Sequence, residues 1–323
     1  EIQNQPYSAF EIKALRKKEN QTETEFLGYC KEYLSRIEVS KSISTYRKRK
    51  SVVTKLKDFL GSKPLPFNQI TVSLLMDFEK YLYSIGNGKN TVGNHVRIIR
   101  TILYSAIKEG KFDQGKNPFF GYTIAREKVN KEKLTEDEIK SIEELTVPKN
   151  SLTWHVRNCF LFSYYNHGMR SGDVIRLKWS SIQSDRLIYQ MGKTKMIKDI
   201  RISRKALAIL KMYSRSNKRG YVFPFLVEGQ DDQNELMLFN RVSAKNALIN
   251  KYLKKIAGQS KIKKNLSFHI ARHSFASIAR DKTHDLSAIQ KALGHTSIKV
   301  TEIYLNTLSN DQLDEFSEKV YKE

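Results

Sequence analysis

The sequence predicts a mainly α-helical protein of two domains with one small β-hairpin. Apolar residues recur three and four positions apart through most of the 323 residues, which is the spacing of amphipathic helices. The stretch 187–202 shows partial two-residue alternation on both sides of a bend at 192–196, which indicates two strands. Residues 122–133 are polar and lack an apolar period, so they are expected to link two helical regions.

The domain layout follows from these patterns. We expect 1–21 to be an arm or the remnant of a linker, and 22–121 to be a helical domain. After the linker, 134–308 should form a second, mostly helical domain, and 309–323 an acidic tail. The first residue is not Met, which is compatible with a further segment ahead of it.

Charge indicates the kind of partner. The net charge is +23, and the basic excess is spread over the chain. Residues 1–125 hold 21 Lys and Arg against 12 Asp and Glu, and the remaining residues hold 36 against 22. Contact of both domains with a polyanion explains this distribution, although charge that merely maintains solubility is the alternative.

Other classes of protein are disfavoured by the sequence. No run approaches the ~20 apolar residues of a membrane span, and no signal peptide is visible. Cys30 and Cys159 are too few for a disulfide framework or a cysteine metal cluster. We therefore expect a cytoplasmic protein.

Four helices are expected in the first domain, beginning near Thr22 and then covering 44–60, 71–82 and 90–107, with Thr71 as an N-cap. The second opens with a basic run, and the fourth carries polar side chains three residues apart. Such side chains suit the DNA backbone or a groove, although a solvated helix surface has the same composition. The candidates are Arg47, Lys48, Lys50, Asn94, Arg97 and Arg100.

The second domain should open with a capping box, in which Thr135 caps a helix and Glu138 lies three residues later. Gly294 should end a later helix. A basic connector, 259–267, carries Lys261, Lys263 and Lys264 as possible phosphate contacts, and 227–237 should be a polar loop. Further helices are expected at 152–166, 204–215, 239–258, 287–293 and 297–305.

The chemistry is concentrated near the C-terminus. His269 and Arg272 are three apart, so one turn of helix directs both to the same object. Arginine binds two oxygens of a phosphate, and histidine donates a hydrogen bond or moves a proton. His295 follows a glycine, and Tyr304 offers a hydroxyl that is nucleophilic once its high pKa is overcome.

A metal site is the alternative for part of this motif. His269 and His273 have the four-residue spacing of zinc ligands on a helix. The glutamate of His-Glu-x-x-His is missing, however, and Arg272 places a cation between the two rings. No metal is therefore expected.

Two boxes carry a resemblance to a known family. His-x-x-Arg-His-Ser-Phe-Ala at 269–276, Leu-Gly-His at 293–295 and Thr-x-x-Tyr at 301–304 resemble the C-terminal signature of the tyrosine recombinases, the phage-integrase family. The run 168–179 matches the family's first box. Its matching residues are Gly168, Met169, Arg170, Asp173, Leu177 and Trp179.

The resemblance implies a role for each matching residue. Tyr304 would attack the scissile phosphate of DNA, and Arg170 and Arg272 would clamp its non-bridging oxygens. His269 and His295 would act as donors and proton carriers around the phosphate. This chemistry requires neither metal nor ATP, so no cofactor is expected.

The hairpin should supply one more residue. The family places a lysine there that protonates the leaving 5′-oxygen, and Lys193, in Gly-Lys-Thr, fits; Lys195 is the second choice, and both could simply be solvated. Asp173 is expected to hold the guanidinium of Arg170. The sequence departs from the family pattern at His167, where a small residue is usual, and at Gly172, where Ser is usual.

The family implies a core-binding and a catalytic domain that enclose DNA. The resemblance is to integrases of conjugative or mobilisable elements, and it implies integration or excision by a homotetramer on specific DNA sites, with possible accessory DNA-bending or excision proteins. The tail, 309–323, would dock on a neighbouring protomer. Alternatives on the same fold are a DNA topoisomerase of type IB and an inactive DNA-binding accessory protein.

Overall fold

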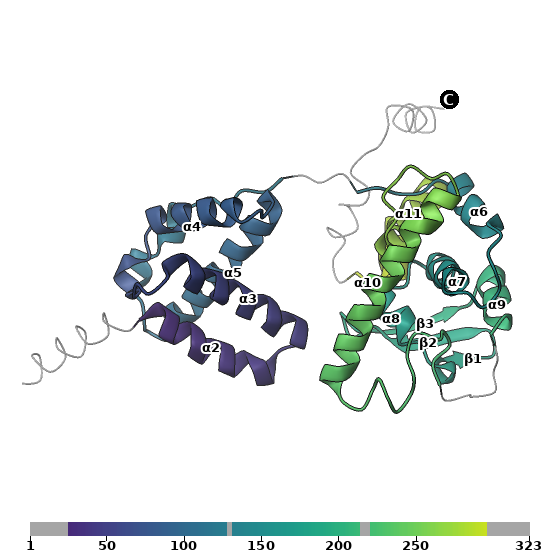
Figure 1. Ribbon diagram of the computed structural model, residues 1–323, viewed down its shortest axis with the longest axis horizontal. Coiled ribbons are helices and arrows are strands. Elements are labelled where there is room, and N and C mark those ends of the chain that lie inside the picture. The colour runs from purple at the N-terminus through teal and green to yellow at the C-terminus, as the bar shows by residue number, and fades with distance from the viewer. Residues whose placement is uncertain (1–24, 128–130, 214–219, 296–323) are drawn as a thin grey trace, which may run out of the picture. The chain divides into compact units, whose positions relative to one another are not determined.

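The computed structural model describes residues 25–127, 131–213 and 220–295 (Figure 1). The chain forms two compact units, Glu1–Val129 and Asn130–Glu323, here called unit 1 and unit 2, and each has its own hydrophobic core. Helices predominate in the described parts of both, and unit 2 contains a small antiparallel sheet. The predicted fold class is therefore confirmed.

Unit 1 is built from helices that match the expected ones to within a few residues. They are α2 (Phe26–Ser40), α3 (Ile43–Leu60), α4 (Val72–Ser84) and α5 (Lys89–Lys108). α5 packs against the other three because one of its faces is apolar, with Val92, Val96 and Ile99 buried. The Thr71 hydroxyl accepts a hydrogen bond from the Leu74 N–H at 3.2 Å, so the expected N-cap is confirmed.

The first half of the expected linker packs on unit 1. The Asn90 side chain exchanges two hydrogen bonds with the backbone of Glu127, at 2.9 and 3.1 Å, and Ile124 packs on the core. Gly93 permits this approach, since a Cβ there would lie 2.7 Å from the carbonyl oxygen of Ala125. This segment is extended and not helical, so the search for a helical period missed its packing.

Unit 2 surrounds α7 (Leu152–Tyr165), which contacts five other helices. α7 is buried around most of its circumference because its sequence is apolar on nearly all sides. α6 opens with the expected capping box of Thr135 and Glu138. The surrounding helices are α6 (Glu136–Glu144), α8 (Ser171–Ile175), α9 (Arg204–Lys211), α10 (Glu235–Gln259) and α11 (Phe268–Thr283), and α12 (Leu286–Leu293) packs on α11.

The sheet has the order β1-β2-β3, with β1 (Ile182–Gln183), β2 (Arg186–Gln190) and β3 (Ile197–Arg201). β1 was not expected from the sequence, and two residues are too few to show a pattern. In the β2–β3 hairpin Tyr189 pairs with Lys198. Alternation along β3 leaves Ile197 72% exposed and buries Lys198. The apolar side chain is thus in solvent and the charged one is inside, the opposite of what their polarity suggests.

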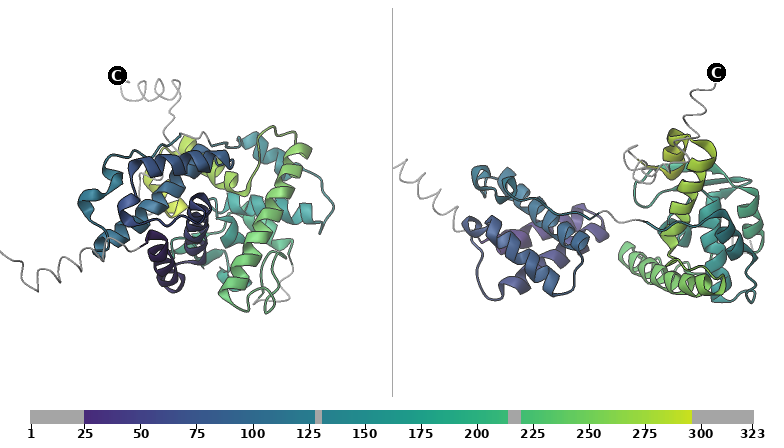
Figure 2. Two further views of the ribbon diagram at one scale, coloured as in Figure 1. Left: turned by 60° about the vertical axis from the view of Figure 1, so that its left-hand side comes forward. Right: turned by 90° about the horizontal axis from the view of Figure 1, so that it is seen from above.

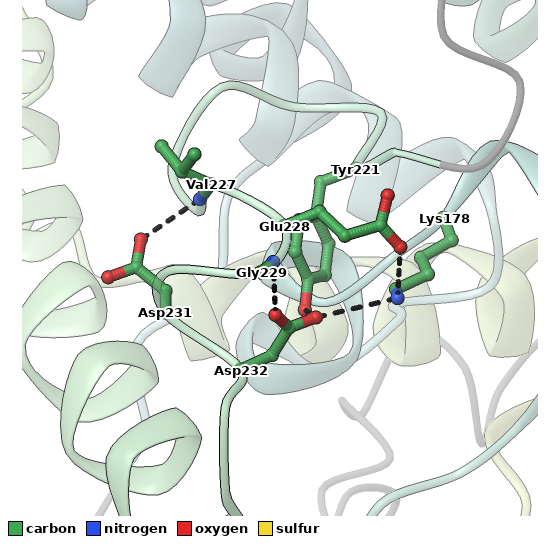
Figure 3. Close-up of polar contacts among 7 residues, drawn as sticks. All are labelled: Lys178, Tyr221, Val227, Glu228, Gly229, Asp231 and Asp232. Atoms are coloured by element: carbon green, nitrogen blue, oxygen red, sulfur yellow. Dashed lines mark hydrogen bonds and ion pairs between the residues drawn. The ribbon is translucent and has the colours of Figure 1, made fainter.

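The loop before α10 is held by charged side chains (Figure 3). The ammonium of Lys178 donates to Glu228 at 2.7 Å and to Asp232 at 3.5 Å, and the Tyr221 hydroxyl donates to Asp232 at 2.8 Å.

The expected polar loop is also shorter than predicted. α10 begins at Glu235 and not at Phe239, because the Asn234 side chain caps it by accepting from the Met237 N–H.

α10 is the longest described helix, with 25 residues, and lies along one edge of unit 2 (Figure 2). No described helix combines the length and the apolar composition that a bilayer span requires.

Candidate active site

Arg272 connects three segments of unit 2. It lies on α11 and is 3% exposed. Its Nη1 donates to the carbonyl oxygen of Gly168 at 3.0 Å, and its Nη2 donates to the carbonyl oxygen of Leu293. The guanidinium therefore joins α11 to the turn after α7 and to the end of α12.

The turn after α7 depends on an unusual backbone. His167 and Gly168 have φ values of 58° and 64°, in the left-handed region. A Cβ on Gly168 would lie 2.6 Å from the Cα of Arg272, so only glycine fits there. The ring of His167 stacks on Phe275, with 5.3 Å between centroids, which accounts for a bulky residue where a small one was expected.

Arg170 begins α8 as its N-cap residue. Its Nη1 is buried and has no hydrogen-bond partner among the described residues. Asp173 was expected to hold this guanidinium, and that prediction is wrong. The Asp173 carboxylate accepts instead from the Gly192 N–H at 2.9 Å and lies 3.6 Å from the Nη2 of Arg176.

Asp173 thus fixes the hairpin, directly before Lys193. Gly192 leaves room for this contact, because a Cβ there would lie 2.9 Å from the Asp173 carboxylate and closer still to the Nη2 of Arg176. Lys193 and Lys195 are both exposed. Of these two, only Lys193 contributes to the lowered pKa values of His269 and His295, so it lies nearer to the site.

Lys198 is a residue that the sequence analysis missed. It is 9% exposed, and its ammonium donates to the carbonyl oxygens of Lys291 and Ala292, each at 2.5 Å. Burial, Arg272 and Arg170 lower the pKa of Lys198 to about 8. Strict two-residue alternation would have found it, because 198, 200 and 202 share the inward face of β3.

His269 and His295 lie within electrostatic range of the same cations. Desolvation and the positive charges of nearby cations, among them Arg272, Arg170 and Lys193, together lower the pKa of each ring to about 4. The sequence-predicted residues Arg170, Lys193, His269, Arg272 and His295 are therefore neighbours, and both imidazoles are neutral at pH 7.

His273 packs against His269 on α11. The two rings meet edge to face, with 4.5 Å between centroids. Burial, followed by the neighbouring charges, lowers the pKa of His273 to about 3. The described residues contain no group of three His, Cys, Asp or Glu side chains that could hold a metal ion.

The remaining candidates divide by location. Tyr304 lies outside the described residues. In unit 1, Arg47, Lys48 and Lys50 are exposed on α3. On α5, Asn94 and Arg100 are exposed, and Arg97 donates to the Asn94 side chain at 2.8 Å.

The basic connector before α11 holds two exposed lysines, Lys261 and Lys263. Lys264, the third lysine of the connector, forms an ion pair with Glu138 at 2.5 Å. That pair ties the connector to the start of α6.

Replacing Gly168 by Ala should destabilise unit 2 strongly. Gly229→Ala is the control, since Gly229 also has a positive φ but open space around it, so it should cost only the ~1–2 kcal/mol of left-handed backbone. Gly168→Ala should cost about 1–3 kcal/mol more in unfolding free energy, because its added methyl group is overpacked against α11. Urea unfolding followed by tryptophan fluorescence reports unit 2, which contains both tryptophans, Trp154 and Trp179. Equal losses in the two variants would contradict the close contact.

Acid should destabilise unit 2 through His273. Its pKa is about 3 in the folded chain against an ordinary 6.5, so the unfolded chain takes up the proton first. The stability that this neutral ring provides is complete above pH 6.5 and declines by about 1 kcal/mol per pH unit below it. His273→Gln should reduce the slope of unfolding free energy against pH between 6.5 and 4 by about 1 kcal/mol per pH unit, and His269 and His295 should supply the slope that is left. An unchanged slope would show that His273 is not the group that titrates.

Family models match nearly the whole described chain. A model described as the phage integrase family matches residues 132–311, and one described as the phage integrase SAM-like domain matches residues 25–124. The tyrosine recombinase XerC of Pediococcus pentosaceus is 24% identical over 307 residues, covering 92% of this chain and 98% of that protein.

Solved structures share the fold at low sequence identity. The Tn1549 transposon integrase in complex with transposon right end DNA has a TM-score of 0.68 at 13% identity, over 93% of this chain and 100% of that one. A lambda integrase tetramer bound to a Holliday junction has a TM-score of 0.64 at 15% identity, over 92% and 83%. With a family model covering more than half of its length, this chain belongs to the phage integrase family of tyrosine recombinases.

Proposed function

We propose that this recombinase cuts and rejoins double-stranded DNA at specific sites through a 3′-phosphotyrosine, and so integrates or excises a mobile element. One observation carries the proposal. Arg170, Arg272, Lys193, His269 and His295 come from four separate segments, and all three cations lie within electrostatic range of both histidines. A DNA phosphate is the anion that such a group of donors fits.

The phosphate would be held by the two arginines. The buried Nη1 of Arg170 has no partner among the described residues, so it is available to a non-bridging oxygen. Arg272 is fixed by two carbonyl oxygens before DNA arrives. Donors that are already in place stabilise the charge that builds up in the transition state without reorganising.

Cleavage then follows as a single displacement. The hydroxyl oxygen of Tyr304 forms a bond to phosphorus while the bond to the 5′-oxygen breaks. A neutral imidazole, His269 or His295, accepts the tyrosine proton, and the Lys193 ammonium donates a proton to the departing 5′-oxygen. The pKa values of about 4 keep both imidazoles able to accept at neutral pH. Attack by another 5′-hydroxyl reverses these steps and joins the strands, so no cofactor is consumed.

Unit 1 would add contacts to the duplex. Arg47, Lys48 and Lys50 on α3 present exposed cations to the phosphate backbone, and Asn94, Arg97 and Arg100 on α5 are spaced for a groove. Lys261 and Lys263 extend the basic surface of unit 2. A homotetramer on two DNA sites in a bacterial cytoplasm is the assembly we propose, with the acidic tail docked on a neighbour.

Tyr304→Phe should abolish the covalent adduct while DNA binding is retained. The substrate is a duplex nicked near the scissile bond. Cleavage then releases a short fragment that carries the freed 5′-hydroxyl, and once this fragment has diffused away the adduct cannot be reversed and accumulates. Wild-type protein should give a labelled peptide that contains Tyr304, and the variant should bind the same duplex with unchanged affinity.

Three results would contradict this assignment. An adduct that persists in Tyr304→Phe means another nucleophile. DNA binding without any adduct in the wild type favours an inactive accessory protein. Relaxation of a supercoiled plasmid that lacks a recombination site favours a topoisomerase.

A further inference from the structure

Lys198 has no part in the mechanism above, yet it is buried within electrostatic range of Arg272 and Arg170. Its position on β3 faces inward beside Ile200, where an apolar residue would be expected. Burying an ammonium is unfavourable unless it is well paired. The pairing that Lys198 makes therefore points to its purpose.

The ammonium lies against the last turn of α12. The last carbonyls of a helix have no partner within the helix, and together they carry a partial negative charge. Lys198 donates to two of them, those of Lys291 and Ala292, and Arg272 donates to the next, that of Leu293. Two cations thus cap three consecutive carbonyl oxygens.

The chain that follows this turn is fixed on the hairpin as well. Gly294 is left-handed, with φ 62° and ψ 47°, and a Cβ there would lie 2.7 Å from the sulfur of Met191 and 3.2 Å from the Cε of Lys198. His295 comes next, and its N–H donates to the Gln290 carbonyl oxygen at 3.1 Å. The position of His295 is consequently set by the same turn.

We propose that Lys198 is a positioning residue, which holds the end of α12 on the β2–β3 hairpin and so places His295 beside Arg272. The inference rests on the proposed function in so far as it takes His295 to act on the phosphate. Lys198 connects the hairpin that carries Lys193 to the segment that carries His295. The general acid and one imidazole are thereby placed by a common contact.

The test compares Lys198→Met with Lys193→Met. Methionine has a similar length and suits a buried position, but it cannot donate to carbonyl oxygens. Each variant is assayed for adduct formation on the nicked duplex, with oxygen or with sulfur as the bridging 5′ atom. A 5′-thiolate leaves without a proton, so sulfur should restore the Lys193→Met rate and leave Lys198→Met about 10²-fold slow.

Hydrogen exchange gives a readout apart from activity. The peptide covering 286–295 should exchange faster in Lys198→Met and at the wild-type rate in Lys193→Met. Lys198→Arg, which can donate to the same carbonyls, should recover slow exchange and most of the rate. Affinity for DNA should be the same in Lys198→Met and Lys198→Arg as in the wild type.

Several outcomes would overturn the inference. Cleavage by Lys198→Met at the wild-type rate would do so. So would a Lys198→Met variant whose cleavage rate is restored by the sulfur substrate while hydrogen exchange of 286–295 is unchanged, because Lys198 would then be the leaving-group acid. The fluorescence of Trp154 and Trp179 shows whether Lys198→Met is folded. If it is not, Lys198→Arg decides: a folded Lys198→Arg protein without restored activity would also overturn the inference. Absence of an adduct in the wild type would remove the proposed function, whereas the exchange comparison would still decide whether Lys198 anchors α12.

Discussion

The site depends on two cations, Arg272 and Lys198, that backbone carbonyl oxygens hold in the described part of the chain. Arg272 binds the carbonyl oxygens of Gly168 and Leu293, and Lys198 binds those of Lys291 and Ala292. The buried acid Asp173 is directed to Gly192 and Arg176. Carbonyl dipoles fix a cation in place without cancelling its charge, so the site retains the attraction for a phosphate that an ion pair would remove.

This arrangement requires close approach at two glycines. The left-handed Gly168 lies against the backbone of Arg272, and the left-handed Gly294 lies against Met191 and Lys198. Gly294 ends α12, whose last carbonyl oxygens accept from Lys198 and Arg272, and Gly168 follows α7 and offers its own carbonyl oxygen to Arg272. The electrostatics of the site are therefore determined by the packing of α7, α11, α12 and the hairpin. A substitution at either glycine would change the packing and, with it, the electrostatics.

Local sequence rules predicted much of this, and long-range pairing explains what they missed. The caps at Thr71 and Thr135 and the helix end at Gly294 follow from residues three or four apart, and each is confirmed. The partner of Asp173 could not be predicted, because Gly192 is 19 residues away and reaches it only once the hairpin has folded. Lys198 was overlooked because a lysine was assumed to be solvated, although its alternation with Ile200 marked it as inward.

The most direct test replaces a non-bridging oxygen of the scissile phosphate by a methyl group, which removes its negative charge. On an ordinary phosphodiester, Arg170→Ala should slow adduct formation by about 10²–10³-fold, as the loss of a preorganised donor does. On the methylphosphonate the same variant should lose little relative to wild type, because the charge that Arg170 binds is gone. An equal loss on both substrates would contradict the claim that Arg170 acts on the phosphate.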